Sequence, residues 1–418
     1  MTTSEFISTH KTDDVHRLAL SKPPAGVDLH YALQQIEGWQ LACSKLPTWA
    51  ATDDIKYPPR IALEQCSSEA TAQYKTRLLG DAAPPPTPPL LGRGAFCNAF
   101  ADLTGGLGVD FMALAPCFGV ATYVDRQTIL VDAARHNASQ LLGGATMERL
   151  NFVCATAEDY LREMEPVDVL YLDPARRDAT GRKVALIADC SPDVALLHDL
   201  LMQRSRRCII KLSPMLDITA ALSVLPAAVE VHVVSVDGEC KEVIVVLDRE
   251  HHDIVIHCAM ISKGGGREVA LFSFTPAEEA VSSPLLADGI DEYVYEPDAA
   301  LLKAGAFRSV ALRYGLLKLA TDTHLYTSSA LLPEFPGRCW RVVGHCGFGK
   351  RELRSMLAGV RSAEIGVRGF PGSVASLRRQ LHLSDGPDAH LIATTLADGS
   401  HRLLRVELVQ KSSAALCV

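Results

Sequence analysis

The segment FADLTGGLGVD, residues 100–110, decides the expected fold. It ends an apolar strand at Asp102, continues with three glycines (Gly105, Gly106 and Gly108), and then turns helical. Glycine lets the backbone adopt positive φ and come close to a ligand, and the first amides of the helix face that ligand. The segment therefore predicts a strand-to-helix turn that binds a nucleotide-like molecule, with tight packing as the structural alternative.

Strand-like and helix-like segments alternate after this turn. The alternation predicts a parallel sheet with right-handed crossovers. The last two strands are separated by only five residues, 237–241, which is too short for a crossover and predicts an antiparallel hairpin at the sheet edge. The expected strands are Asn98–Leu103, Val120–Val124, Asn151–Cys154, Val167–Leu172, Cys208–Leu212, Val229–Val236 and Glu242–Leu247.

The regions outside this sheet show different patterns. The N-terminal part predicts helices broken at Pro47 and at Pro58–Pro59, one of which is RIALEQCSSEATAQYKTRLL, residues 60–79. Five prolines in residues 84–89 cannot continue a helix and predict an extended connector or a loop. The C-terminal part predicts short strands around the turn KGGGRE, helices near 297–319, 350–359 and 373–381, and a final hairpin turning at Asp398–Gly399.

Length and charge limit the possible classes of protein. The 418 residues predict two to three domains, and 48% hydrophobic with 22% charged residues is typical of a globular protein. The net charge of −8 excludes a uniformly basic nucleic-acid coat. Residues 331–418, however, hold 12 basic and 7 acidic residues. This basic end indicates contact with a polyanion, although ordinary scatter of charge explains it as well.

Cysteine usage and hydropathy bear on location and metals. The twelve cysteines form no CxxC pair, and the nearest approach to a metal set is Cys339, His345 and Cys346. Buried thiols are the simpler interpretation, so we predict no metal and a reducing, cytoplasmic location. The N-terminus is polar and mixed in charge, unlike a secretory signal. Since no apolar run approaches the ~18 residues that span a membrane, we expect no membrane association.

Two acidic residues indicate the kind of ligand. Asp102 stands just before the glycines, where a carboxylate repels a pyrophosphate but favours the cationic amine and sulfonium of S-adenosylmethionine. Asp125 closes the next strand, 23 residues later, at about the interval at which an acidic residue binds ribose hydroxyls. A helix N-cap is the structural alternative for Asp125.

The fourth strand ends in VLYLDPARR, residues 169–177. Ligands of an open parallel sheet lie beyond the carboxyl ends of its strands, which places Asp173 beside the glycine turn. Pro174 forces an exposed bend, so the carboxylate and nearby carbonyls suit a substrate amino group. Arg176 and the arginine after it suit a phosphate or a base plane, and a solvated surface turn is the alternative. Lys211 and Ser213, after the fifth strand, are expected to border the same cleft, with a salt bridge the usual role of such a lysine.

These motifs together resemble class I S-adenosylmethionine-dependent methyltransferases, and more narrowly the bacterial members that carry a C-terminal THUMP-like domain. The resemblance covers most of the chain. It implies an α/β fold: a Rossmann-like sheet with an antiparallel terminal hairpin, an N-terminal helical region, and C-terminal α+β domains of ferredoxin-like and THUMP-like type. The matching segments are LEQCSSEATAQYK (63–75), DLTGGLGVD (102–110), DPARR (173–177), YEPDAALLKAGAF (295–307), THLYTS (323–328), FPGR (335–338) and VRGFPGSVASLRRQLHLSDG (367–386).

The resemblance also implies domain limits and a site. The expected domains are a helical region with the proline-rich connector (1–90), the methyltransferase domain (91–250), a ferredoxin-like domain (251–335) and a THUMP-like domain (336–418). The expected catalytic residues are Asp173, Pro174 and Arg176. The expected residues around S-adenosylmethionine are Asp102, Thr104, Gly105, Gly106, Gly108, Asp110, Asp125, Arg126, Thr156, Ala157 and Asp173.

Two departures from the family pattern concern the substrate and the adenine. Ala175 and Arg176 replace the second proline and the aromatic residue of the tetrad that many amino-methylating enzymes use. After the third strand, Thr156 stands where many relatives place an acidic residue, with Glu158 and Asp159 just beyond it.

Four functions are compatible with these patterns to different degrees. THUMP domains are associated with RNA, so the resemblance implies methylation of a tRNA or rRNA base, with phosphate contacts from residues such as Arg368, Arg378 and Arg379. A methyltransferase of proteins or small molecules explains the core equally well and the acidic net charge better. A nicotinamide-dependent dehydrogenase has only the glycine count in its favour, and a binding protein without catalysis has Asp102, Asp125 and Asp173 against it.

Overall fold

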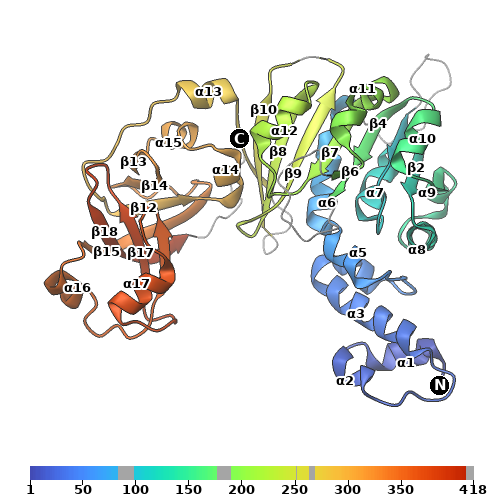
Figure 1. Cartoon of the computed structure of the whole chain (residues 1–418), viewed down its shortest axis with the longest axis horizontal. Helices are drawn as coiled ribbons and strands as arrows, with labels where there is room; N and C mark the ends of the chain where they lie inside the picture. The colour runs from blue at the N-terminus through green and yellow to red at the C-terminus, as the bar shows by residue number, and fades with distance from the viewer. Residues whose placement is uncertain (83–97, 177–189, 251, 263–268, 411–418) are drawn as a thin grey trace. The chain divides into compact units, whose positions relative to one another are not determined.

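The computed structural model describes residues 1–82, 98–176, 190–250, 252–262 and 269–410 (Figure 1). The proline-rich connector and the KGGGRE turn lie outside these residues. The chain divides into two compact units. The first comprises Met1–Val229 with Ile244–His252, and the second comprises Glu230–Val243 with Asp253–Val418.

Short helices form the N-terminal part of the first unit. The expected breaks at Pro47 and Pro58–Pro59 are confirmed, but the expected single helix over 60–79 is wrong. It is interrupted because the Ser68 hydroxyl caps a new helix by accepting from the Thr71 amide. The elements are α1 (Thr3–His10), α2 (Val15–Ala19), α3 (Leu29–Lys45), α4 (Pro47–Ala51), α5 (Arg60–Gln65), α6 (Glu69–Lys75) and the 3-10 helix η1 (Thr76–Ala82).

The expected parallel strands follow and are confirmed. Parallel pairing joins β7 to β4, β4 to β1, β1 to β2 and β2 to β3. The strands are β1 (Ala99–Asp102), β2 (Val120–Asp125), β3 (Leu150–Cys154), β4 (Val167–Leu172) and β7 (Ser205–Leu212), with a small pair β5 (Ala175–Arg176) and β6 (Cys190–Ser191). The helices are α7 (Val109–Leu114), η2 (Ala115–Cys117), α8 (Thr128–Leu141), α9 (Gly144–Met147), α10 (Ala157–Glu163), α11 (Val194–Arg204) and α12 (Ile218–Val224).

The central strands are buried on both faces, which explains their nearly continuous apolar sequences. All four residues of β1 are buried. The Phe100 ring stacks between Phe111 and Phe118, with ring centroids 6.0 and 5.1 Å away. Tyr123 of β2 and Tyr171 of β4 are also buried. This aromatic core holds the carboxyl ends of β1, β2 and β4 in fixed relative positions.

The expected terminal hairpin is present, but its expected place at the sheet edge is wrong. It consists of β8 (Ala228–Val236) and β9 (Glu239–Asp248), joined by Asp237 and Gly238, whose φ angles of 51° and 80° are those of a tight hairpin turn. The hydrogen-bonded strand order is β11-β10-β8-β9-β7-β4-β1-β2-β3. Two further strands therefore extend the sheet beyond β8, since the free edge of β8 pairs with β10 in parallel.

The second unit holds these added strands and a separate seven-stranded sheet. The order of that sheet is β13-β14-β12-β15-β18-β17-β16, and the expected final hairpin of β17 and β18 is confirmed (Figure 1). The strands are β10 (Val255–Ile261), β11 (Val269–Phe274), β12 (Tyr293–Pro297), β13 (Leu317–Ala320), β14 (Thr323–Ser328), β15 (Gly337–Cys346), β16 (Glu364–Arg368), β17 (His390–Thr395) and β18 (His401–Gln410). The helices are α13 (Pro276–Val281), α14 (Ala299–Ala304), α15 (Ser309–Tyr314), α16 (Lys350–Met356) and α17 (Val374–Leu381).

Candidate functional site

The glycine turn lies at the carboxyl end of β1, as expected. The Leu103 amide donates to the Tyr171 carbonyl oxygen at 3.0 Å, so the strand pairing continues past Asp102. The chain then reverses through Gly106 and Gly108, whose φ angles of 54° and 88° lie in the left-handed region that favours glycine. Gly108 is the N-cap of α7. The turn thus directs backbone groups and the start of a helix toward one point above the sheet.

Close packing against β2 fixes the shape of this turn. The Gly105 amide donates to the Val124 carbonyl oxygen at 2.9 Å. A Cβ atom on Gly105 would lie 2.1 Å from the Tyr123 ring, so no other residue fits there. The Tyr123 hydroxyl in turn donates to the Gly106 carbonyl oxygen at 2.5 Å. Packing against Tyr123 therefore requires glycine at position 105.

Asp125, at the end of β2, holds the turn from the other side. One carboxylate oxygen accepts from the Gly106 amide at 3.0 Å, and the other accepts from the Gln127 amide at 2.8 Å. Gln127 is the N-cap of α8 and has no side-chain cap of its own. Asp125 therefore organises both the glycine turn and the first residues of α8, and its half-buried carboxylate retains lone pairs for a ligand.

Asp102 is an almost fully buried carboxylate, with 1% of its surface exposed. It accepts from the Thr104 amide at 3.0 Å, and within the described residues it forms no ion pair. Burial raises the pKa of Asp102 well above its usual range, and the nearby Asp110 and Asp173 carboxylates raise it further. A buried carboxylate with so little compensation is a favourable place for a ligand cation.

Asp173 lies close to Asp102, because β4 pairs with β1. Its amide donates to the Thr104 hydroxyl at 2.6 Å, and its half-buried carboxylate forms an ion pair with Lys211 of β7. Burial raises the pKa of Asp173, and Lys211 opposes that rise. Of the two expected uses of Lys211, the salt bridge is confirmed.

The residues after Asp173 form a short bend. Pro174 is buried, Ala175 is exposed, and Ala175–Arg176 pairs antiparallel with Cys190–Ser191. The Arg176 side chain and Arg177 lie outside the described part of the structure.

Asp110, expected near the cofactor, instead has its carboxylate in a buried network. It accepts from the Lys75 ammonium at 2.9 Å, the Ser67 hydroxyl at 2.7 Å and the Tyr171 hydroxyl at 2.8 Å. Although burial alone would raise the pKa of Asp110, Lys75, Lys211 and Ser67 hold it below its usual value. Its side chain therefore ties α7 to the N-terminal helices and leaves little capacity for a ligand.

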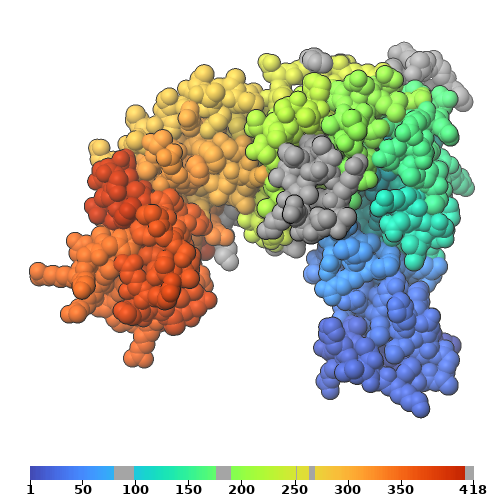
Figure 2. Space-filling view, viewed as in Figure 1, coloured from blue at the N-terminus to red at the C-terminus, as the bar shows by residue number. Residues whose placement is uncertain are grey.

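Sequence reasoning did not identify this network, because Lys75 and Ser67 lie far from the glycine turn in the chain. Both side chains are buried, and the Lys75 side chain is completely so. A buried lysine needs a partner. The position of Lys75 beside Tyr74 and Ala72, which are also buried in the same short helix, was the one sign in the sequence that it pairs with a buried acidic residue. Figure 2 shows the lighter blue segment of this N-terminal region next to the teal surface of the first unit, with the dark blue helices extending away from it.

The end of α5 also lies near the site. Lys45 donates to the Leu63 and Glu64 carbonyl oxygens at 2.8 Å each, which fixes the turn before Cys66. Burial raises the pKa of the Cys66 thiol to about 11, and the charges of Asp110, Lys211 and Asp173 also influence it. Cys66 is therefore a protonated, unreactive neighbour of the site at neutral pH.

The residues expected near adenine follow β3. Thr156 is exposed and caps α10, accepting from the Asp159 amide at 3.1 Å, while Ala157 is buried. The Ala155 amide donates to the Asp125 carbonyl oxygen at 3.1 Å, which brings this loop beside the end of β2. Arg126 extends an exposed side chain from the same edge. The structure therefore brings the β1, β2, β3 and β4 motifs to one edge of the sheet.

The arginines expected to contact phosphate lie in the second unit and differ from one another. Arg368 forms an ion pair with the buried Glu296, and Arg378 forms one with Asp385. Arg379 is exposed. The Arg368 and Arg378 guanidinium groups are therefore paired with carboxylates, with which a phosphate would compete, and their expected phosphate contacts stay a prediction.

The structure also separates the two cysteines of the set Cys339, His345 and Cys346. Cys339 and Cys346 both lie on β15, seven residues apart. At about 3.3 Å per residue in a strand, they cannot share an ion.

Comparison with family models assigns the second unit. A ferredoxin-like domain model matches residues 293–336, and a THUMP domain-like model matches residues 337–408. β10 and β11 precede the first match and belong to the nine-stranded sheet.

Comparison with known proteins covers the whole chain. A proposed methyltransferase of Porphyromonas gingivalis W83, known from its crystal structure, is 34% identical and superposes with a TM-score of 0.83 over 98% of both chains. An uncharacterized S-adenosylmethionine-dependent methyltransferase of Mycobacterium tuberculosis, from strains CDC 1551 / Oshkosh and H37Rv, is 25% identical over 84% of this chain and 86% of its own. With this fold and glycine turn, the protein is an S-adenosylmethionine-dependent methyltransferase. The chain belongs to the class I family whose members carry a C-terminal THUMP-like domain.

The described residues fit this cofactor. The Asp102 carboxylate is buried at the end of β1 beside this turn, and a carboxylate in such a place suits a ligand ammonium. Gly106 faces open space, since a Cβ atom there would meet only the Thr104 carbonyl oxygen at 3.7 Å. Among the described residues, no helix is both long and apolar enough to cross a membrane.

Proposed function

We propose that this methyltransferase acts on RNA, on a base of tRNA or rRNA. The observation that carries the proposal is the match of residues 337–408 to a THUMP-like domain on the same chain as a cofactor-binding core. THUMP domains are associated with RNA, so the class of substrate comes by analogy with that domain. A basic C-terminal part on an acidic protein supports it, since electrostatic attraction to phosphates supplies much of the affinity for nucleic acid.

We assign the cofactor contacts from the positions of the side chains. Asp102 binds the methionine ammonium, the backbone of the Thr104–Gly108 turn lies against the methionine portion, and Asp125 binds the ribose hydroxyls. Arg126, Thr156 and Ala157 border the adenine. The Asp110 carboxylate pairs with Lys75 and so holds α7 against the N-terminal helices; we assign it no direct contact with the cofactor. When bound, S-adenosylmethionine supplies a methyl group already activated by the sulfonium.

Asp173 and Pro174 orient the acceptor atom. A carboxylate and a neighbouring carbonyl oxygen both accept hydrogen bonds, so they suit an amino group and stabilise positive charge as it develops there. Lys211 and Thr104 fix Asp173 in place from two sides. Alignment of the acceptor in line with the methyl group then provides most of the rate. Arg176, on the bend that follows, is the residue we expect to stack on the target base.

The RNA surface that we propose is centred on α16. Lys350, Arg351 and Arg354 are exposed, and none of the three forms an ion pair within the described residues. Two half-buried aromatic rings, Phe348 and Phe370, stack with centroids 5.0 Å apart just before and beyond this helix. Exposed cations beside aromatic rings suit phosphates and unpaired bases.

Transfer of radioactivity from methyl-labelled cofactor tests the proposal. The full-length protein is incubated with total RNA, with cell protein and with a small-molecule extract, and the Asp102→Asn variant serves as the inactive control. We expect label in RNA that ribonuclease removes. Label in protein or in the small-molecule fraction, with none in RNA, would instead select the second candidate function, which the net charge of −8 favours.

A further inference from the structure

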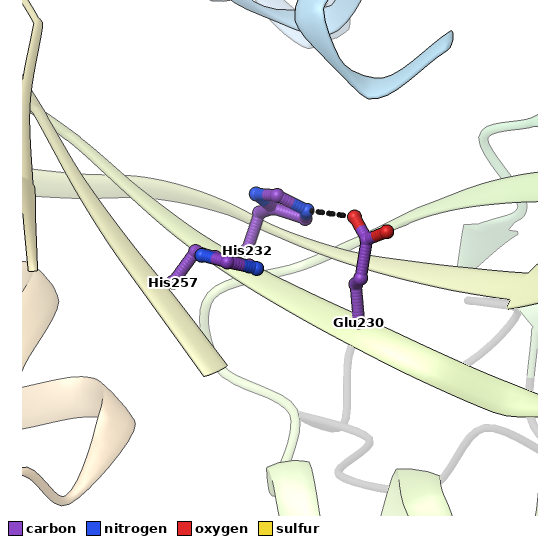
Figure 3. Close-up of side chains that lie close together, drawn as sticks. All are labelled: Glu230, His232 and His257. Atoms are coloured by element: carbon purple, nitrogen blue, oxygen red, sulfur yellow. Dashed lines mark hydrogen bonds and ion pairs between the residues drawn. The ribbon is translucent and has the colours of Figure 1, made fainter. Parts of the chain in front are cut away.

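Three metal-binding side chains meet on the extension of the large sheet, far in sequence from the cofactor motifs. His232 of β8 and His257 of β10 are direct partners in the parallel register, and Glu230 precedes His232 by two residues on the same face of its strand. Ser273 of β11 is the register partner of His257 on its other side. Figure 3 shows the Glu230, His232 and His257 side chains close together, and Ser273 extends this polar group to a third strand.

The donor atoms of this polar group are close together. The His232 Nε2 and a Glu230 carboxylate oxygen are 2.9 Å apart, and the candidate ligand atoms of Glu230, His232 and His257 all lie within 4.8 Å of one another. The two imidazole rings are stacked, with centroids 4.6 Å apart. Small rotations of these side chains therefore suffice to place three donors around one ion.

The environment of His257 favours its neutral imidazole, which is the form that binds metals. Burial lowers the pKa of His257 to about 4, and the adjacent His232 contributes to this effect. The Ser273 hydroxyl lies 2.7 Å from Nδ1 of His257 and fixes that nitrogen, which leaves Nε2 as the ligand atom. The Glu230 side chain is 28% exposed, so an ion can reach the cluster from solvent.

We propose that Glu230, His232 and His257 bind one divalent transition-metal ion, for which zinc is the expected occupant. Two imidazole nitrogens and one carboxylate oxygen are a common zinc donor set, and a fourth position remains for water. Imidazole ligands also disfavour calcium and magnesium, which prefer oxygen. The ion would join β8 to β10 and so strengthen the place where the sheet is extended beyond its hairpin. The alternative is a simple ion pair between His232 and Glu230.

Zinc binding to the full-length protein tests this assignment. Protein stripped with a chelator is titrated with zinc by calorimetry, and X-ray absorption at the zinc edge identifies the ligand atoms. We expect one ion per chain with nitrogen and oxygen ligands and no sulfur, together with a raised Tm. Zinc bound only through sulfur would mean that it sits on cysteines elsewhere, and this outcome would overturn the proposal, as would the absence of saturable binding.

Variants locate the ion. Glu230→Gln and His257→Gln each remove one donor, and Ser273→Ala removes the support of His257, so we expect zinc affinity to fall about tenfold or more in each. His390→Gln is the matched control, because His390 also pairs with a glutamate on a neighbouring strand, Glu364, but no third donor joins them among the residues that the structure describes. Glu230→Gln changes a partly exposed side chain and should fold normally, so unchanged affinity in that variant would contradict the site even if His257→Gln failed to fold.

Discussion

Asp102 and Asp173 have the same side chain at the ends of neighbouring strands, but their surroundings differ. Asp173 is half-buried and paired with Lys211, whereas Asp102 is buried and accepts from a backbone amide. Burial raises the pKa of both carboxyls, and the ion pair opposes the rise at Asp173. A cationic ligand should therefore stabilise the ionised form of Asp102 more than that of Asp173, because Lys211 already stabilises the charge of Asp173.

Replacement of Asp102 by Asn should separate stability from cofactor binding. The pKa of Asp102 is higher in the folded state than in the unfolded chain. The free energy of unfolding therefore falls as the pH rises, and the loss is complete once the pH exceeds the pKa of Asp102 in the folded state. We expect Asp102→Asn to be more stable than the wild type at pH 8 without ligand, by about 1 kcal/mol. Differential scanning calorimetry measures this difference.

The same variant should lose the stabilisation that the cofactor product provides. S-Adenosylhomocysteine should raise the Tm of the wild type more at pH 8 than at pH 6, since binding favours ionised Asp102. In Asp102→Asn this shift should be small at both values. An equal ligand-induced shift in the two proteins would show that Asp102 does not bind the ligand cation.

Removal of Lys211 should alter the pH dependence of methyl transfer. Without the ammonium group, burial raises the pKa of Asp173 further, so a higher pH is needed to ionise it. We expect the acidic limb of the kcat profile to move to higher pH in Lys211→Met and to return in Lys211→Arg. The cofactor Kd should stay nearly constant, and an unmoved acidic limb in Lys211→Met would argue against a role for ionised Asp173.

At the scale of elements, the buried Lys75–Asp110 pair connects α6 to α7. Two further hydroxyls, from Ser67 and Tyr171, complete the hydrogen bonding of the carboxylate. A buried ion pair of this kind adds little net stability compared with apolar side chains, but it costs a great deal when one partner is lost. It therefore specifies how the N-terminal helices are placed on the helix that follows the glycine turn.

Loss of one partner from this pair should destabilise the protein strongly. We expect Lys75→Met to reduce the free energy of unfolding at pH 7 by about 3–5 kcal/mol, because the Asp110 charge stays buried without compensation. The pKa of Asp110 should then rise, so the deficit should shrink as the pH falls toward 5. Chemical denaturation at both pH values measures it. The double variant Lys75→Met with Asp110→Asn should recover part of the loss, and a double variant no better than the single one would contradict this account.

Elements with strong local signals could be predicted from the sequence. The parallel strands were expected because each is an apolar run. The turn at 102–108 was expected because glycines follow an aspartate directly after such a run, and glycine adopts the positive φ angles of a tight turn. The break at Ser68 was missed, since apolar spacing continues through it. The network around Lys75 was missed for another reason: its members are brought together by packing and not by spacing along the chain.

At the scale of the whole molecule, the choice of partner strand was the main error of prediction. The Asp237–Gly238 turn identified a hairpin, but the pairing of β10 with the outer edge of β8 depends on residues that follow it, at 255–261. That pairing also creates the row formed by His232 and His257, so a cluster that depends on this register had no local signature in the sequence.

Charge reversal on α16 tests the proposed RNA surface. Lys350→Glu with Arg354→Glu places repulsive charges toward phosphate, so we expect RNA affinity to fall and its dependence on salt to weaken. S-Adenosylhomocysteine binding should not change. Arg135→Glu with Arg162→Glu, an equal change of charge at exposed positions of α8 and α10, is the control. Filter binding at several salt concentrations compares the proteins, and equal losses in the two double variants would indicate a general charge effect.

The burial of Lys75 also determines where the chain can be cut. A fragment that began at residue 98 would keep every strand of the parallel sheet and its glycine turn, yet it would lose Lys75 and Ser67, two of the three donors to the Asp110 carboxylate. The helices at the start of the chain thus share a buried polar network with the helix that follows the glycine turn, and we expect a shortened enzyme to need them.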